Sequence, residues 1–140
     1  MLDVGPAMPE TVEFFAEYRC RLFFLDLFSE SFLENQADLE EDELRSALIG
    51  ALTIPASTKF DICLFWDFLN YLDDRSLELF FELLAPNFQN STKAHGFGTL
   101  NGKTPILNHQ YGLLGKAALS VRERDNCSTA CYPHSQTEMR

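Results

Sequence analysis

The 140 residues carry a formal net charge of −10 and are 46% hydrophobic, with 13 phenylalanines. This composition is typical of a globular chain of one domain with a substantial core, and it excludes a disordered polymer. The acids are unevenly spread: residues 1–100 hold 18 Asp and Glu against 6 Lys and Arg, and residues 101–140 hold 3 against 5. Because an acidic surface repels a phosphate backbone, we do not expect nucleic acid as a main partner.

The sequence shows no sign of a membrane or secretory segment. It has no run of about 18 apolar residues, and Asp3 and Glu10 stand where a signal peptide would be positive or apolar. We therefore expect a cytoplasmic protein that contacts no membrane. The cysteines are then expected to be free thiols, with Cys20 and Cys63 as small buried hydrophobes in or beside strands.

The first half of the chain alternates strand-like and helical segments. Residues 2–4 predict the end of a strand, and "PETVEFFAEY" predicts a helix that begins at Pro9 and repeats Val12 and Phe15 on one face. Residues 20–25 are apolar on both faces, which predicts a strand in a sheet covered on both sides. The acidic run of residues 40–43 fits the first turn of a helix, where negative charge meets the positive end of the dipole.

The pattern continues to residue 100. A faint strand is expected at residues 51–54, a clear one at 60–65, and another at 91–100. Between the last two, Asp73 or Asp74 can cap an amphipathic helix that Pro86 ends. This order predicts an α/β fold, specifically a Rossmann-like three-layer α/β/α sandwich with a mainly parallel sheet.

The segment after Leu100 differs in composition. We divide the chain into a Rossmann-like cofactor-binding core, residues 1–100, and a loop-rich C-terminal extension of the same domain, residues 101–140. Within the extension, "NGKTPILNHQYGLLG" is expected to be a loop, "KAALSVRER" is compatible with a strand and "PHSQTEMR" with a helix start. No metal site is predicted, because the three candidate ligands have no fourth at zinc-like spacing: Cys127, Cys131 and His134.

Acidic and aromatic residues follow three of the expected strands. Ligands of open α/β sheets bind outside the carboxyl ends of the strands, which is where Asp3, Asp26 and the pair Trp66–Asp67 lie. A carboxylate after the second strand suits ribose hydroxyls, although Asp26 is equally compatible with a simple loop cap. Asp3, Gly5 and Asp67 at the neighbouring ends favour the ligand interpretation.

The first loop discriminates between nucleotides. A pyrophosphate needs close-approach glycines and free backbone N–H groups, yet Pro6 and Pro9 remove donors while Glu10 and Glu13 add negative charge. NAD or FAD therefore fits poorly, which makes a nucleotide-dependent oxidoreductase the weakest alternative. A nucleoside that carries a positive charge and no phosphate fits better.

Four segments give the chain a family resemblance: "LDVGPAMPETVEFF", "CRLFFLDLF", "FDICLFWDFLNYLDD" and "AHGFGTLN". In order and spacing the chain resembles the class I S-adenosylmethionine-dependent methyltransferases, in particular small bacterial methyltransferase-domain proteins of unassigned substrate. The resemblance implies transfer of a methyl group from S-adenosylmethionine to a small-molecule or protein acceptor. The family has further residues before the first strand and two strands after the last helix, so the domain is expected to be incomplete at both termini.

The resemblance also implies roles for individual residues. Asp3 would contact the methionine end of the cofactor, Gly5 would let the backbone approach it, and Asp26 would hold the ribose. Around them, the resemblance places further residues beside the adenine, along the pocket and on the substrate side: Leu27 and Phe28, Trp66 and Asp67, and Asn70 and Tyr71. Asp67 and His95 are candidate general bases, although a histidine within a strand is more often structural.

A non-catalytic role is the alternative. An incomplete sheet would leave open strand edges and apolar surface, which favour association with a partner or a second copy of the chain. The chain would then be an α/β protein that acts through protein–protein contacts, including a homo-oligomer formed through the sheet edges.

Overall fold

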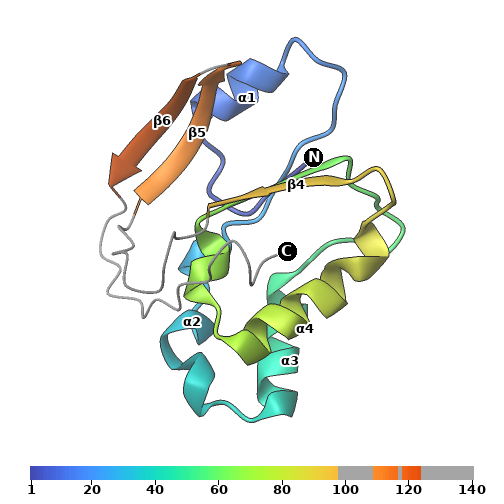
Figure 1. Ribbon diagram of the computed structural model, residues 1–140, viewed down its shortest axis with the longest axis vertical. Coiled ribbons are helices and arrows are strands. Elements are labelled where there is room, and N and C mark those ends of the chain that lie inside the picture. Colours follow the sequence, from blue (N-terminus) through green and yellow to red (C-terminus); the bar gives the residue numbers. More distant parts are fainter. Residues whose placement is uncertain (98–108, 117, 124–140) are drawn as a thin grey trace.

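The computed structural model describes residues 1–97, 109–116 and 118–123 (Figure 1). Within these residues a four-stranded parallel sheet has the order β2-β1-β3-β4. Its strands are β1 (Leu2–Asp3), β2 (Phe23–Phe24), β3 (Ile62–Trp66) and β4 (Lys93–Gly96). Helices connect successive strands, so the protein is a mixed α/β protein with a parallel sheet, as the alternating pattern predicts.

Helices lie on both sides of this sheet (Figure 1). The α-helices are α1 (Pro9–Phe15), α2 (Phe32–Asn35), α3 (Glu41–Ala51) and α4 (Asp74–Leu84). Short 3₁₀ turns follow strand or helix ends: η1 (Leu27–Ser29), η2 (Gln36–Asp38), η3 (Phe68–Tyr71) and η4 (Ala85–Asn87). In Figure 1, α1 lies on one side of the sheet and α2, α3 and α4 on the other.

The main hydrophobic core lies on the side of α2, α3 and α4. Alternate side chains of β3 point to opposite faces, so Cys63 and Phe65 join this core, whereas Leu64 and Trp66 are buried outside it. Phe80 of α4 is fully buried and packs edge-on against Phe65, with ring centroids 5.7 Å apart. β3 is thus covered on both faces, and the face that bears Trp66 is the one that leads to the candidate site.

The capping residues set where α3 and α4 begin. The Asp73 carboxylate accepts a hydrogen bond of 2.8 Å from the Ser76 backbone N–H, which confirms Asp73 as the cap of α4. At the start of α3, the Glu40 backbone N–H donates to the Glu43 carboxylate at 3.0 Å. The acidic run is therefore the solvated first turn of a helix, as the sequence predicts.

A second, two-stranded sheet lies outside the parallel one. Strands β5 (His109–Gly115) and β6 (Ala118–Glu123) form an antiparallel hairpin that packs on α1. The Leu113 N–H donates to Thr11 Oγ1 at 3.0 Å, and the Ser120 hydroxyl donates to Glu10 Oε1 at 2.6 Å. The hydrogen bond from Ser120 is the main reason that the pKa of Glu10 lies below its ordinary value. The hairpin thereby covers the side of α1 that bears Glu10 and Thr11.

The hairpin corrects one expectation and confirms another. A strand at residues 118–123 agrees with the sequence, whereas residues 109–115 were expected to be a loop and form β5. Their glycines weaken any local strand preference, and only pairing with β6 stabilises the strand. Strands β5 and β6 form a sheet of their own and do not extend the parallel sheet among the described residues.

Other local expectations were also wrong. Strand β2 covers two residues of the predicted six and is half-buried at the edge of the sheet, which leaves Cys20 exposed. In α1 it is Thr11 that is buried, while Val12 is 42% exposed, because Thr11 faces β5. Residues 51–54 form the end of α3 and an irregular segment, without a strand. Cys63 is buried as predicted, and burial raises the pKa of its thiol to about 11.

Among the described residues, no helix combines the length and hydropathy needed to span a membrane. Within the same residues, no group of three His, Cys, Asp or Glu side chains is arranged to hold a metal ion. The segment with Cys127, Cys131 and His134, and the helix start expected after residue 132, lie outside the described residues.

Candidate functional site

The order of the strands in the parallel sheet reverses between β1 and β3. From β1 the chain moves to β2 on one side and then returns to β3 on the other side of β1. In parallel α/β sheets, ligands bind at the carboxyl ends of the two strands where the order reverses in this way. Here those ends are Asp3 to Gly5 after β1 and Trp66 to Asp67 after β3. The residues that the sequence singles out therefore lie at the carboxyl ends of the two strands where the order reverses.

Asp3 is the centre of this site. It is fully buried, and its Oδ1 atom accepts two hydrogen bonds, one from the Gly5 N–H at 2.8 Å and one from Trp66 Nε1 at 2.9 Å. Its second oxygen, Oδ2, is also buried and has no hydrogen-bond partner among the described residues. A buried carboxylate oxygen without a donor costs free energy, so this atom is one that a ligand N–H or O–H would satisfy.

The protonation of Asp3 follows from this geometry. Burial raises the pKa of Asp3 from 3.8 to about 6, and the nearby negative charge of Asp26 adds to the rise. The hydrogen bonds from Gly5 and Trp66 act in the opposite direction and limit it. Asp3 is thus an anion above pH 6 that readily takes up a proton, and a positively charged ligand group beside Oδ2 would keep it ionised.

Gly5 fits this position because the space around its Cα is small. A Cβ atom there would lie 3.2 Å from Asp3 Oδ1 and 3.6 Å from Trp66 Cδ1. A side chain would therefore crowd the two groups that hold the Asp3 carboxylate. The single glycine that the loop keeps is the one that this contact requires.

Trp66 has an unusual backbone conformation at the end of β3. Its φ is 52°, the only positive φ at a non-glycine position among the described residues, and the pairing of β3 with β4 shifts register between Leu64 and Trp66. Positive φ is rare for a bulky residue and persists where the surroundings hold it, commonly at functional sites. Here the hydrogen bond from its indole to Asp3 is one such constraint.

The hairpin contributes an aromatic group to the same place. The Tyr111 ring of β5 stacks on the Trp66 indole, with centroids 5.6 Å apart and planes 15° from parallel. The ring centroid of Phe97 lies 5.0 Å from that of Tyr111, and the ring centroid of His95 lies 6.0 Å from that of Trp66. The predicted set of site residues omitted Tyr111, because it lies in a segment interpreted as a loop. Its position shows that β5 forms one wall of the site.

The residues after β2 divide into two groups. Asp26 is exposed at the end of the strand, and its negative charge influences Asp3 electrostatically. Leu27 and Phe28, in contrast, are 2% and 7% exposed and belong to the main core. The Phe28 ring packs edge-on against Phe68 at 5.3 Å. Only Asp26 of the three is therefore accessible from solvent.

The residues after β3 are also mostly interior. Asp67 is 4% exposed and precedes η3, and Asn70 donates through Nδ2 to the backbone carbonyls of Asp67 and Phe97 at 3.2 and 2.6 Å. Tyr71 lies in the core, where its ring packs on Phe28. Asn70 thus fixes the backbone around Asp67, and His95 is an exposed ring on β4.

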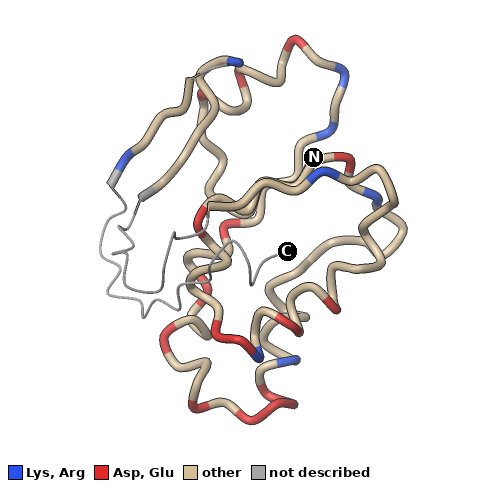
Figure 2. Tube along the Cα trace, viewed as in Figure 1, with Lys and Arg blue, Asp and Glu red and all other residues tan. Residues whose placement is uncertain are grey.

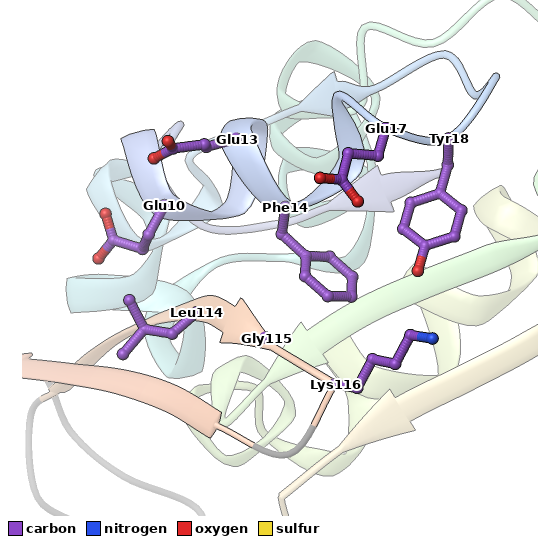
Figure 3. Close-up of a pocket in the computed structure, with 8 residues that line it drawn as sticks. All are labelled: Glu10, Glu13, Phe14, Glu17, Tyr18, Leu114, Gly115 and Lys116. Atoms are coloured by element: carbon purple, nitrogen blue, oxygen red, sulfur yellow. The ribbon is translucent and has the colours of Figure 1, made fainter.

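A separate cavity of about 400 Å³ lies between α1 and the end of β5 (Figure 3). Three carboxylates and two aromatic rings of the α1 segment face Leu114, Gly115 and Lys116 across it: Glu10, Glu13, Glu17, Phe14 and Tyr18. None of the strand-end residues lines this cavity. It is a different feature from the site at Asp3.

No family model, curated protein or solved structure matches the chain. The site must therefore be interpreted from its own geometry.

Proposed function

We propose that the chain binds S-adenosylmethionine at the carboxyl ends of β1, β2 and β3, and that it is the cofactor-binding core of a methyltransferase. The order β2-β1-β3-β4 with helices on both sides supports the finer assignment of a Rossmann-like three-layer sandwich. The observation that carries the proposal is the unpartnered Oδ2 of the buried Asp3 at the point of strand reversal.

The residues present fit this cofactor better than a phosphate-bearing one. A ligand ammonium group would donate to Asp3 Oδ2 and hold that carboxylate in its ionised form. The exposed Asp26 at the end of β2 would accept hydrogen bonds from ribose hydroxyls. The loop after Gly5 places Pro6, Pro9 and Glu10 where a pyrophosphate would need donors.

S-adenosylmethionine, when bound, would supply a methyl group already activated on a sulfonium. The protein's own task is then to bind and orient the reacting groups and to keep water away from them. Gly5 would let the backbone approach the ligand, and Trp66 and Tyr111 would provide an apolar wall. His95, whose ring centroid lies 6.0 Å from that of Trp66, and Asp67, which follows Trp66 in the chain, are candidate general bases for a small-molecule or protein acceptor.

Calorimetric titration with S-adenosylmethionine and S-adenosylhomocysteine at pH 7.5 tests the proposal. We expect saturable binding to the wild-type chain and at least tenfold weaker binding to Asp3→Asn, because the variant loses a charge-assisted hydrogen bond. Asp38→Asn is the matched control, since Asp38 is exposed in η2, away from the strand ends. Absence of heat at millimolar ligand, or equal affinities of wild type and Asp3→Asn, would contradict it.

Association is a second candidate function, and β4 is the observation that favours it. This strand is the edge of the parallel sheet among the described residues, and all four of its residues are exposed. An exposed edge strand favours pairing with a strand of another chain. Size-exclusion chromatography with light scattering distinguishes the two functions: a dimer without cofactor binding supports association, and a monomer at all concentrations contradicts it.

A further inference from the structure

Positively charged residues gather at the amino ends of the parallel strands, the end of the sheet opposite to the candidate site. The parallel strands all begin at this end, where Arg19 and Arg21 precede β2, Lys59 precedes β3 and Lys93 begins β4. Figure 2 shows several Lys and Arg residues around the N-terminus, with one acidic position among them, whereas acids predominate along the helices in the lower part of the picture. On a chain with net charge −10, this end is the exception.

The remaining two cations of residues 1–97 interact with groups of the helical layer. Arg45 forms an ion pair of 3.1 Å with Glu82. Arg75 donates to the backbone carbonyls of Gln36 and Leu39 at 2.9 and 2.8 Å. The Arg21 guanidinium, in contrast, has no ion pair or hydrogen bond with any described residue. It is therefore available to a ligand.

A cavity of about 350 Å³ lies at this end, with Arg21 and Lys59 in its lining. The hydroxyl residues Ser57 and Thr58 contribute further hydrogen-bond donors, and the half-buried ring of Phe23 provides apolar surface. Phe60 also lines the cavity, but it is only 1% exposed. No acidic residue is among the described residues that line it. The lining thus combines two cationic side chains, two hydroxyl groups, one partly exposed aromatic ring and Met1.

The walls of the cavity are fixed by hydrogen bonds of their own. The Asn87 side chain is 4% exposed and donates to the carbonyls of Pro55 and Thr58 at 3.1 and 2.8 Å, which holds the turn that carries the two hydroxyl residues. The Phe60 N–H donates to the Asn87 carbonyl at 2.9 Å. Lys59 itself donates to the Pro86 carbonyl, which holds its ammonium near the cavity. A ligand would meet donors that are already in place.

We propose that this cavity binds a small organic anion, an oxyanion carried on an aromatic or otherwise apolar body. The guanidinium of Arg21 would hold the oxyanion with two parallel N–H groups, and the Lys59 ammonium would act as a second point charge. The apolar body would lie against Phe23, whose ring packs edge-on against the buried Phe60 ring with centroids 5.9 Å apart. Carboxylates and phosphate monoesters share this chemistry. This cavity lies at the amino ends of the strands, whereas Asp3 lies at a carboxyl end. The proposal of an anion site therefore does not depend on binding of S-adenosylmethionine.

The test is a titration of the ¹⁵N-labelled chain with phenyl phosphate, benzoate, benzyl alcohol and inorganic phosphate, followed by NMR. We expect saturable shifts of the Ser57 and Thr58 amides with phenyl phosphate or benzoate, and the stronger of these two identifies the headgroup. Benzyl alcohol lacks the charge and inorganic phosphate lacks the apolar body, so both are expected to bind at least tenfold more weakly.

Variants locate the binding. Arg21→Gln and Lys59→Gln should each weaken it at least tenfold, whereas Arg19→Gln, which removes the same charge outside the lining, should change it less than about twofold. Both lining cations are exposed, so their variants are expected to keep the wild-type amide spectrum. Absence of saturation up to roughly 10 mM, equal binding of inorganic phosphate, or an equal effect of Arg19→Gln would overturn the proposal.

Discussion

The Asp3→Asn variant should remove the contribution of Asp3 to the pH dependence of the free energy of unfolding. Burial raises the pKa of Asp3 from 3.8 to about 6, so the folded protein binds this proton more tightly than the unfolded chain does. Stability contributed by the protonated group is present below pH 4 and is lost as the pH rises through 6. The difference of about 2 between the two pKa values corresponds to about 3 kcal/mol.

The variant removes the charge and keeps one acceptor. The asparagine side chain would still present a carbonyl to the N–H groups of Gly5 and Trp66, while its amide takes the place of the unpartnered Oδ2. Leaving that amide unsatisfied costs about 1–3 kcal/mol. At pH 7.5 the gain from removing a buried charge and this cost nearly cancel, so we expect Asp3→Asn to be as stable as wild type or about 1 kcal/mol more stable.

Urea unfolding monitored by circular dichroism from pH 4.5 to 8 measures the effect. The free energy of unfolding of wild type, relative to Asp3→Asn, should fall by about 2 kcal/mol across this range, since part of the 3 kcal/mol lies below pH 4.5. Asp38→Asn is the control, and its free energy of unfolding should change with pH in parallel with that of wild type. A difference between wild type and Asp3→Asn that stays constant with pH would refute the assignment of a raised pKa to Asp3.

Two further predictions concern the elements that frame the site. Gly112→Ala would place a Cβ 2.7 Å from Ser120 Oγ and should destabilise docking of the hairpin by about 1–3 kcal/mol, measured by thermal unfolding. Gly115→Ala is the control, because a Cβ there meets no atom within 4 Å and should not change stability. Equal effects of the two variants would contradict the close approach at Gly112. Asp73→Ala should cost about 1 kcal/mol in urea unfolding through loss of the α4 cap. Asp73→Asn keeps an oxygen that accepts from the Ser76 N–H, so a cost as large for this variant would show that the cap is not the cause.

The sequence predicts several of the local elements and the end of the sheet where the candidate site lies. Apolar runs and helical spacing locate β3 and α4, and acids or glycine after the strands locate Asp3, Gly5 and Asp26. These features depend on neighbouring residues, so a local pattern contains them. The family resemblance, in contrast, placed Leu27 and Phe28 beside an adenine, because matching sequence positions does not distinguish a buried side chain from an accessible one.

The contacts that build the site are non-local, which explains why the sequence did not reveal them. The Trp66 indole reaches Asp3 across 63 residues, and Tyr111 comes from a strand that exists only through pairing with β6. The positive φ of Trp66 follows a register shift between β3 and β4. No periodicity within one segment encodes such contacts.

The indole N–H of Trp66 gives the most direct test of cofactor binding at this site. Trp66 is the single tryptophan of the chain, so its Nε1–H resonance is unambiguous, and its acceptor is Asp3 Oδ1. On titration with S-adenosylmethionine we predict that this resonance shifts and saturates together with the Gly5 amide. If neither resonance moves at millimolar ligand, the chain does not bind the cofactor at the carboxyl ends of β1 and β3.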